Sequence, residues 1–121
     1  AQSMRWHKEE HKRQENLMGH PADGLSWINF DNEYPEFAKD CRNVRLGLAS
    51  DGFNPFGTMS QSYSMWPVLL LTYNLSPWMC MKKEYMMMTL LILGPKAPGK
   101  EIDIYMQPLI DELKDLWSNG L

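Results

Sequence analysis

The sequence lacks the features that mark secreted, membrane-spanning and zinc-binding proteins. Among its 121 residues only Cys41 and Cys80 are cysteines, too few for a disulfide framework and without a C-x-x-C pair for zinc. The longest apolar stretches, near residues 65–71 and 85–93, are shorter than the roughly 20 residues that span a bilayer. The opening residues 1–17 are polar and charged, unlike a secretory signal. These absences predict an intracellular protein in a reducing compartment, with no membrane segment.

A strongly basic surface is also missing. Twelve Lys and Arg residues stand against fifteen Asp and Glu residues, which gives a formal net charge of −3. A free-standing DNA-binding domain usually carries a basic stripe, because neutralising phosphates supplies most of its non-specific affinity. The composition therefore argues against a dedicated DNA reader, and any contact with DNA is expected at an active site.

The residues that are present predict one globular α+β domain. Hydrophobic residues make up 44% of the chain and include five tryptophans, which is typical of a folded core. Three stretches, at about residues 44–50, 65–73 and 85–93, have the composition of strands. The last two are almost continuously apolar, as expected of strands covered on both faces. Consecutive strands joined by short Pro- and Gly-containing loops usually pair as an antiparallel meander.

Helices are expected on both sides of this meander. Short helices are predicted at about residues 22–31 and 35–38, with Trp27, Phe30, Tyr34 and Phe37 as core residues, whereas residues 1–19 form a polar lead-in without an apolar face. A final helix starts near Asp103 or just before Pro108 and stops at Asn119-Gly120. Its apolar residues recur at steps of three and four: Ile102, Met106, Leu109, Leu113 and Leu116–Trp117.

The first predicted strand ends at the candidate functional residue, Asp51. Alternation gives this strand an apolar face of Val44, Leu46 and Leu48. Asp51 falls on the other face, which carries Arg45, Gly47 and Ala49, and it precedes Gly52 and the loop of residues 53–57. A carboxylate at a strand end beside small side chains is a common position for a metal ligand. The ordinary alternative is a turn residue that accepts hydrogen bonds from the backbone.

From about His20 to the C-terminus the amino-acid sequence closely resembles plant CACTA-type (En/Spm) transposases. The resemblance is carried by HPADGLSWINFDNEYPEFAKDCRNVRLGLASDGFNPFG, YSMWPVLLLTYNLSPWMCMK and GPKAPGKEIDIYMQPLIDELKDLW, in that order. It implies a nuclear, RNase H-like, DDE-type enzyme that cuts and joins DNA at transposon ends with Mg²⁺ or Mn²⁺. It also implies that Asp51 is the first catalytic acid and a metal ligand. Gly19 and Cys41 depart from the residues common in such relatives.

The same resemblance predicts a partial catalytic core. Residues 1–42 would be a lead-in with short helices, and residues 43–121 the strand–strand–strand–helix half of an RNase H-like domain. The second and third acids of that family follow on a later strand and helix, so this chain is expected to be inactive alone. The alternative function is a non-catalytic interaction module derived from a transposon, which binds an intact transposase or a second copy through its exposed sheet edge.

Other candidate sites have simpler explanations. His7-Lys8-Glu9-Glu10-His11 matches the H-x-x-E-H zinc pattern, but in a segment with no apolar anchor we expect a solvated helix and no zinc. The Met-rich stretches 79–81 and 86–88 are expected to be core filler, and Cys80 has no neighbouring base to activate it. A solvated helix face accounts for the remaining acids of the last helix: Asp103, Asp111, Glu112 and Asp115.

Overall fold

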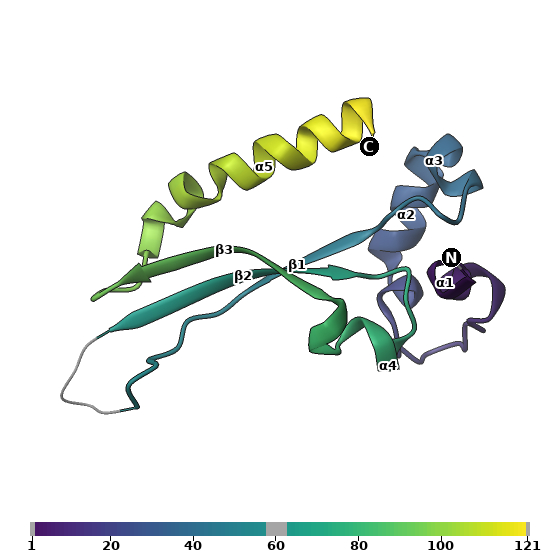
Figure 1. Ribbon diagram of the computed structural model, residues 1–121. Helices are drawn as coiled ribbons and strands as arrows, with labels where there is room; N and C mark the ends of the chain where they lie inside the picture. Colours follow the sequence, from purple (N-terminus) through teal and green to yellow (C-terminus); the bar gives the residue numbers. More distant parts are fainter. Residues whose placement is uncertain (1, 58–62, 121) are drawn as a thin grey trace. The chain divides into compact units, whose positions relative to one another are not determined.

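A computed structural model describes residues 2–57 and 63–120 (Figure 1). Its strands are β1 (Leu46–Ser50), β2 (Ser64–Thr72) and β3 (Met86–Gly94). Its helices are α1 (Trp6–Glu9), α2 (Leu25–Glu33), α3 (Pro35–Lys39), α4 (Pro77–Cys80) and α5 (Ile102–Asn119). Single 3-10 turns occupy Gln2–Arg5, Pro21–Asp23, Lys83–Tyr85 and Gly99–Glu101. In the described residues no helix is both long and apolar enough to cross a membrane.

The three strands form one antiparallel sheet in the order β1-β2-β3, as the sequence predicted, so the α+β class is confirmed. Two pairings define the β1–β2 register: the Tyr73 N–H donates to the Arg45 carbonyl at 2.8 Å, and Phe53 and Met65 form an antiparallel bridge. Both belong to the same register. A consequence is that Gly52 lies opposite Trp66, beyond the end of β1.

The contacts divide the chain into two compact units. The first comprises Ala1–Gly47 with Leu70–Met87, and the second comprises Leu48–Leu69 with Met88–Leu121. Each of the three strands therefore has residues in both units. The boundary at residue 42, which the sequence suggested, is a different kind of division and stays a prediction.

In the first unit, the N-terminal segment is anchored, which corrects the solvated lead-in expected from the sequence. Trp6 opens α1 and is only 8% exposed. Its indole meets the rings of His20 and Trp78 edge-on at 5.1 and 5.5 Å. A single large aromatic residue thus holds a short polar helix that has no repeating apolar pattern. A single anchoring residue produces no periodic pattern, because a pattern requires several apolar residues at regular spacing.

The apolar face that the sequence gives to β1 is exposed. Val44, just before the strand, and Leu46 and Leu48 within it are 47%, 42% and 45% exposed. Gly47 is the one buried residue of β1. A Cβ atom at Gly47 would lie 2.1 Å from Cζ of Tyr73, so the tyrosine ring covers the strand at this position. The alternation correctly predicted a strand, but it did not predict this local contact.

The second unit is built on the buried strand residues Val68 and Ile92, and among its described residues α5 is the one helix longer than one turn. Helix α5 begins at the earlier of its two predicted starts and contains Pro108 internally. It ends where predicted, because Gly120 has φ 71° and its N–H donates to the Leu116 carbonyl at 2.9 Å. Leu109 and Leu113 are half-buried, but Leu116 is exposed, so the packing stripe is shorter than expected.

The methionine stretches were only partly predicted. Cys80 is buried, and burial raises the pKa of its thiol, which agrees with a packing role. Met81, Met87 and Met88, in contrast, are 64%, 62% and 58% exposed. The prediction that the methionines fill the core is wrong for these three residues. The segment between β2 and β3 is also more ordered than a loop, since it contains α4 and a 3-10 turn.

Candidate functional site

Asp51 is exposed and follows directly on the last residue of β1. Its Oδ1 atom accepts a hydrogen bond from the Gly52 backbone N–H at 2.8 Å. The register places its side chain on the β1 face opposite to that of Gly52. The strand thus presents a carboxylate to solvent at its end, as the sequence predicted for a metal ligand. The same hydrogen bond is what a local turn residue would make.

Gly52 is required by a neighbour that sequence reasoning missed. A Cβ atom at this position would lie 2.3 Å from Cε2 and 2.5 Å from Cζ2 of Trp66. The Trp66 indole N–H donates to the Ser64 Oγ at 2.7 Å, which fixes the orientation of the ring. The sequence interpretation of Gly52 as a turn residue is therefore incomplete. The contact between Gly52 and Trp66 follows from the pairing register of β1 and β2, which the sequence alone did not supply.

The loop after Asp51 is folded by its own side chains. The Asn54 Oδ1 atom accepts from the Phe56 N–H at 2.9 Å, and Gly57 adopts the left-handed φ of 63°. Phe53 and Phe56 are 52% and 56% exposed. Phe56 also contacts Tyr63 with ring centroids 5.6 Å apart. Two phenylalanines are thus held in solvent within five residues of the carboxylate.

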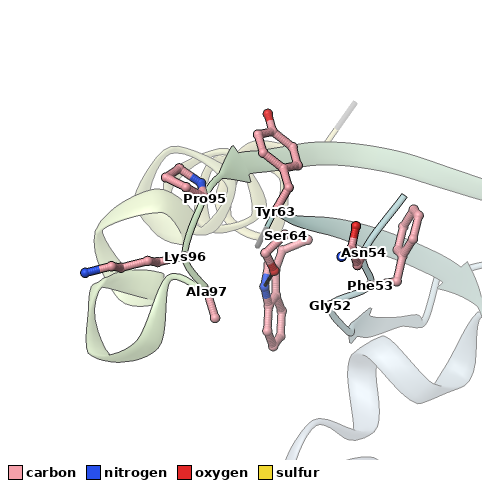
Figure 2. A pocket seen from close by; sticks show the side chains of 9 residues that line it. Gly52, Phe53, Asn54, Tyr63, Ser64, Pro95, Lys96 and Ala97 are labelled. Carbon is pink, nitrogen blue, oxygen red and sulfur yellow. Dashed lines mark hydrogen bonds between the residues drawn. The ribbon is translucent and has the colours of Figure 1, made fainter. Parts of the chain in front are cut away.

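A cavity of about 480 Å³ lies beside this strand end (Figure 2). Its lining comes from the Gly52–Asn54 segment, from the start of β2 and from the turn after β3: Gly52, Phe53, Asn54, Tyr63, Ser64, Trp66, Pro95, Lys96 and Ala97. Figure 2 shows Lys96 and Ala97 on one side of Ser64, and Phe53 and Asn54 on the other. We call this cavity the strand-end pocket. It combines aromatic rings with one lysine.

Asp51 is not part of a ready-made metal centre in the described residues. No three His, Cys, Asp or Glu side chains within residues 2–57 and 63–120 are grouped so as to hold a metal ion. The acids of α5 are exposed, and two of them have partners on their own helix: Asp111 accepts from Gln107 at 2.8 Å, and Asp115 accepts from Asn119 at 2.6 Å. Asp51 is therefore an exposed carboxylate at the end of β1, and its role as a metal ligand stays a prediction.

A second polar cluster lies in the first unit, around three histidines. His20 is 3% exposed, accepts from the Ala22 N–H at Nδ1 and pairs its Nε2 with the Leu75 carbonyl, both at 3.0 Å. Both ring nitrogens are thereby used, and the carbonyl partner identifies Nε2 as the protonated one. Burial lowers the pKa of His20. The imidazole is a neutral structural crosslink.

The two histidines of the H-x-x-E-H pattern have separate partners in this cluster. The His11 Nε2 atom lies 2.6 Å from Oδ1 of Asp23, and this contact lowers the pKa of the Asp23 carboxyl. The His7 ring meets Trp27 edge-on at 5.4 Å, and burial lowers its pKa. Glu10 is exposed. His7 and His11 border a cavity of about 370 Å³ that also includes Arg13 and Asp31.

Arg45 joins the start of β1 to α2 and α3. Its guanidinium lies 4.4 Å from the Trp27 ring centroid and 5.6 and 5.2 Å from those of Phe30 and Phe37. One guanidinium nitrogen lies 2.6 Å from a carboxylate oxygen of Asp31. Three of the aromatic residues predicted as core, Trp27, Phe30 and Phe37, are half-buried and pack around a cation. The prediction is wrong for the fourth, Tyr34, which is 43% exposed. Sequence periodicity gave no indication of this charged partner.

Comparison with known proteins places most of the chain in one family. Residues 15–121 match the profile of a family described as Transposase family tnp2. The matched region contains Asp51, the strand-end pocket and all three strands. No curated protein matches, and no solved structure matches.

Proposed function

Because the chain belongs to the transposase family tnp2, we propose that it is part of a metal-dependent DNA transposase and that Asp51 is its first catalytic acid. The finer assignment is to the CACTA-type (En/Spm) group of plants, with an RNase H-like, DDE-type catalytic core working in the nucleus. The observation that carries this proposal is the exposed carboxylate of Asp51 at the end of β1, inside the region that matches the family.

Phosphodiester cleavage by such an enzyme depends on divalent ions held by carboxylates. When bound, Mg²⁺ or Mn²⁺ would activate the attacking oxygen and stabilise the leaving oxygen. Asp51 fits the role of one oxygen ligand, since it is anionic, exposed and fixed by the Gly52 N–H. The described residues do not complete a site for two ions, so no reaction step is assigned to this chain alone. We propose that the remaining acids are supplied from outside these residues.

The proposal is tested by substituting this chain for the matching segment of an active tnp2 transposase and measuring excision of its element from a reporter plasmid. We expect the Asp51→Asn variant to abolish excision, because the amide loses the negative charge that a metal requires. Asp103→Asn is the matched control, since Asp103 is an exposed carboxylate on α5, and it should excise like the unmodified chimera. Normal excision by Asp51→Asn would refute the assignment.

A second assay addresses the chain by itself. Purified protein is incubated with DNA that carries transposon ends and either Mg²⁺ or Mn²⁺. We expect no cleavage above background, because one carboxylate does not bind two hydrated ions tightly. Cleavage that disappears in Asp51→Asn would mean that the active site is complete within these residues.

The rival proposal is an interaction module derived from a transposon. One observation favours it: β1 is an edge strand of the three-stranded sheet and carries the exposed apolar residues Val44, Leu46 and Leu48. An apolar edge strand is a template for pairing with another chain, either an intact transposase or a second copy. Light scattering over a range of protein concentrations distinguishes the two, since a stable monomer would argue against this role.

A further inference from the structure

We propose that the strand-end pocket binds one unpaired DNA base, which stacks on Trp66 while Lys96 contacts the adjoining phosphate. The choice of DNA rests on the proposed function; the pocket itself rests on the geometry of the described residues. The cavity of about 480 Å³ is large enough for a nucleoside, and it is bordered by Phe53, Tyr63 and Trp66.

Trp66 is prepared for stacking before any ligand arrives. Its ring abuts the backbone at Gly52, where even a methyl group would collide with it. Its indole N–H is already bonded to the Ser64 Oγ at 2.7 Å. The ring is half-buried and borders the cavity. A fixed aromatic surface costs little conformational entropy to use, which favours binding.

The same hydrogen bond indicates how the base would be recognised. Because the indole N–H is taken by Ser64, Trp66 offers its ring surface rather than a hydrogen-bond donor. Stacking of this kind tolerates any base, since every base has a π-face. Lys96 is exposed and borders the pocket, and Figure 2 shows its side chain directed outward, away from Ser64. Its expected contact is therefore a phosphate outside the pocket, next to the bound base, and such a contact carries no sequence preference. The pocket is therefore expected to hold a base without reading its identity.

The position of the pocket defines which part of the DNA it would hold. Asp51 does not line the pocket, whereas the next residues, Gly52, Phe53 and Asn54, do. The carboxylate and the pocket are therefore neighbouring but separate positions on this segment. We infer that the pocket holds a displaced base farther along the strand, and that its contribution is to binding rather than to cleavage.

Aromatic pockets beside a proline also suit proline-rich peptides. DNA is favoured here because the pocket lies inside the region that matches a transposase family and is bordered by a cation. A duplex is a poorer occupant than a single strand, because its bases are stacked on one another and unstacking them costs free energy.

The experiment measures fluorescence anisotropy of a labelled oligothymidine of about 12 nucleotides, titrated with the full chain in EDTA. We expect saturable binding, weakened at least about fivefold by Trp66→Leu and made less salt-dependent by Lys96→Gln. The matched controls are Trp117→Leu and Lys100→Gln, exposed residues of the same unit outside the pocket, which should bind normally. A self-complementary duplex of the same length should bind more weakly.

A cross-linking measurement on the unaltered chain covers the case in which Trp66→Leu fails to fold. An oligonucleotide carrying 5-iodouracil is irradiated with the protein, and the attached peptide is identified by mass spectrometry. Attachment at Trp66 or Tyr63 is expected. No binding, attachment elsewhere, or displacement by a proline-rich peptide at lower concentration than by the oligonucleotide would each overturn the proposal. Because EDTA removes divalent ions, this binding does not depend on a metal at Asp51, so a failure of the metal-site assignment would leave these results unchanged.

Discussion

Replacing Asn74 with alanine should be among the most damaging single changes to the first unit. Asn74 is fully buried and crosslinks the segment before β1. Its Oδ1 atom accepts from the Arg45 N–H at 2.7 Å, and its Nδ2 atom donates to the carbonyls of Asn43 and Cys41 at 2.9 and 3.3 Å. Three backbone groups of the one segment 41–45 are therefore tied to a single amide group.

The expected cost follows from these contacts. The two shorter bonds contribute about 1 kcal/mol each, and each buried backbone group left without a partner costs about 1–3 kcal/mol. We therefore expect Asn74→Ala to lower the free energy of unfolding by about 3–5 kcal/mol. Small domains have only about 5–15 kcal/mol in total, so the loss should be evident. Equilibrium unfolding in urea, followed by circular dichroism, measures it.

Two further variants make this reasoning refutable. Asn119→Ala removes an exposed asparagine that donates to Asp115 and should cost less than about 0.5 kcal/mol. Asn74→Asp keeps an acceptor for the Arg45 N–H but places a carboxylate against two carbonyls. It should regain stability as the pH falls, because the protonated acid can donate. If Asn74→Ala is as stable as Asn119→Ala, the crosslink is not what holds β1.

Two other perturbations test the glycine and histidine contacts. Gly47→Ala should lower the free energy of unfolding in urea by about 1–3 kcal/mol, because the new methyl group collides with the Tyr73 ring. Adding Tyr73→Leu should recover part of this loss. A Gly47→Ala variant as stable as the unaltered chain would refute the contact. As the pH is lowered from 7.5 to 5.5, the free energy of unfolding should decrease. Burial lowers the pKa of His20 and of His7 in the folded chain. Below about pH 6.5 the unfolded chain therefore binds more protons than the folded chain, which favours unfolding. The lowered pKa of Asp23 acts only in more acidic solution, and His20→Asn should flatten the pH profile; an unchanged slope would show that the ring is not the titrating group.

The sequence predicted the strands well because their signals are local. The observed limits of β2 and β3 differ from the predicted ones by one residue, since a continuous apolar run marks a strand locally. The expectation that β3 is covered on both faces was wrong, because Ile92 is its one buried residue and Leu91 and Leu93 are exposed. The stop at Asn119-Gly120 was correct for the same reason: the left-handed φ of Gly120 is a property of glycine itself. Asp51 was correctly placed after β1, although its catalytic role remains a prediction.

The partners of individual residues were not predictable, because each joins distant parts of the chain. Trp6 reaches Trp78 across more than seventy positions, so no local pattern identifies it as an anchor. The burial of Gly47 in β1 was not predicted, because a pattern of hydrophobic residues does not show that the Tyr73 ring fills the space over this glycine. A charge was likewise not expected among aromatic rings, since the attraction of Arg45 to them depends on how the rings are arranged.

The sequence by itself determined the three strands and the last helix, the resemblance to a family and the position of one carboxylate after one strand, because these depend on local periodicity and on short stretches of residues. Only the tertiary structure decided that Tyr73 covers Gly47, that Trp66 makes Gly52 obligatory, and that a cavity lies at the end of β1. The physical reason is the β1–β2 register: a shift of one residue would exchange the two faces, and the register is set by pairing between residues far apart in the chain.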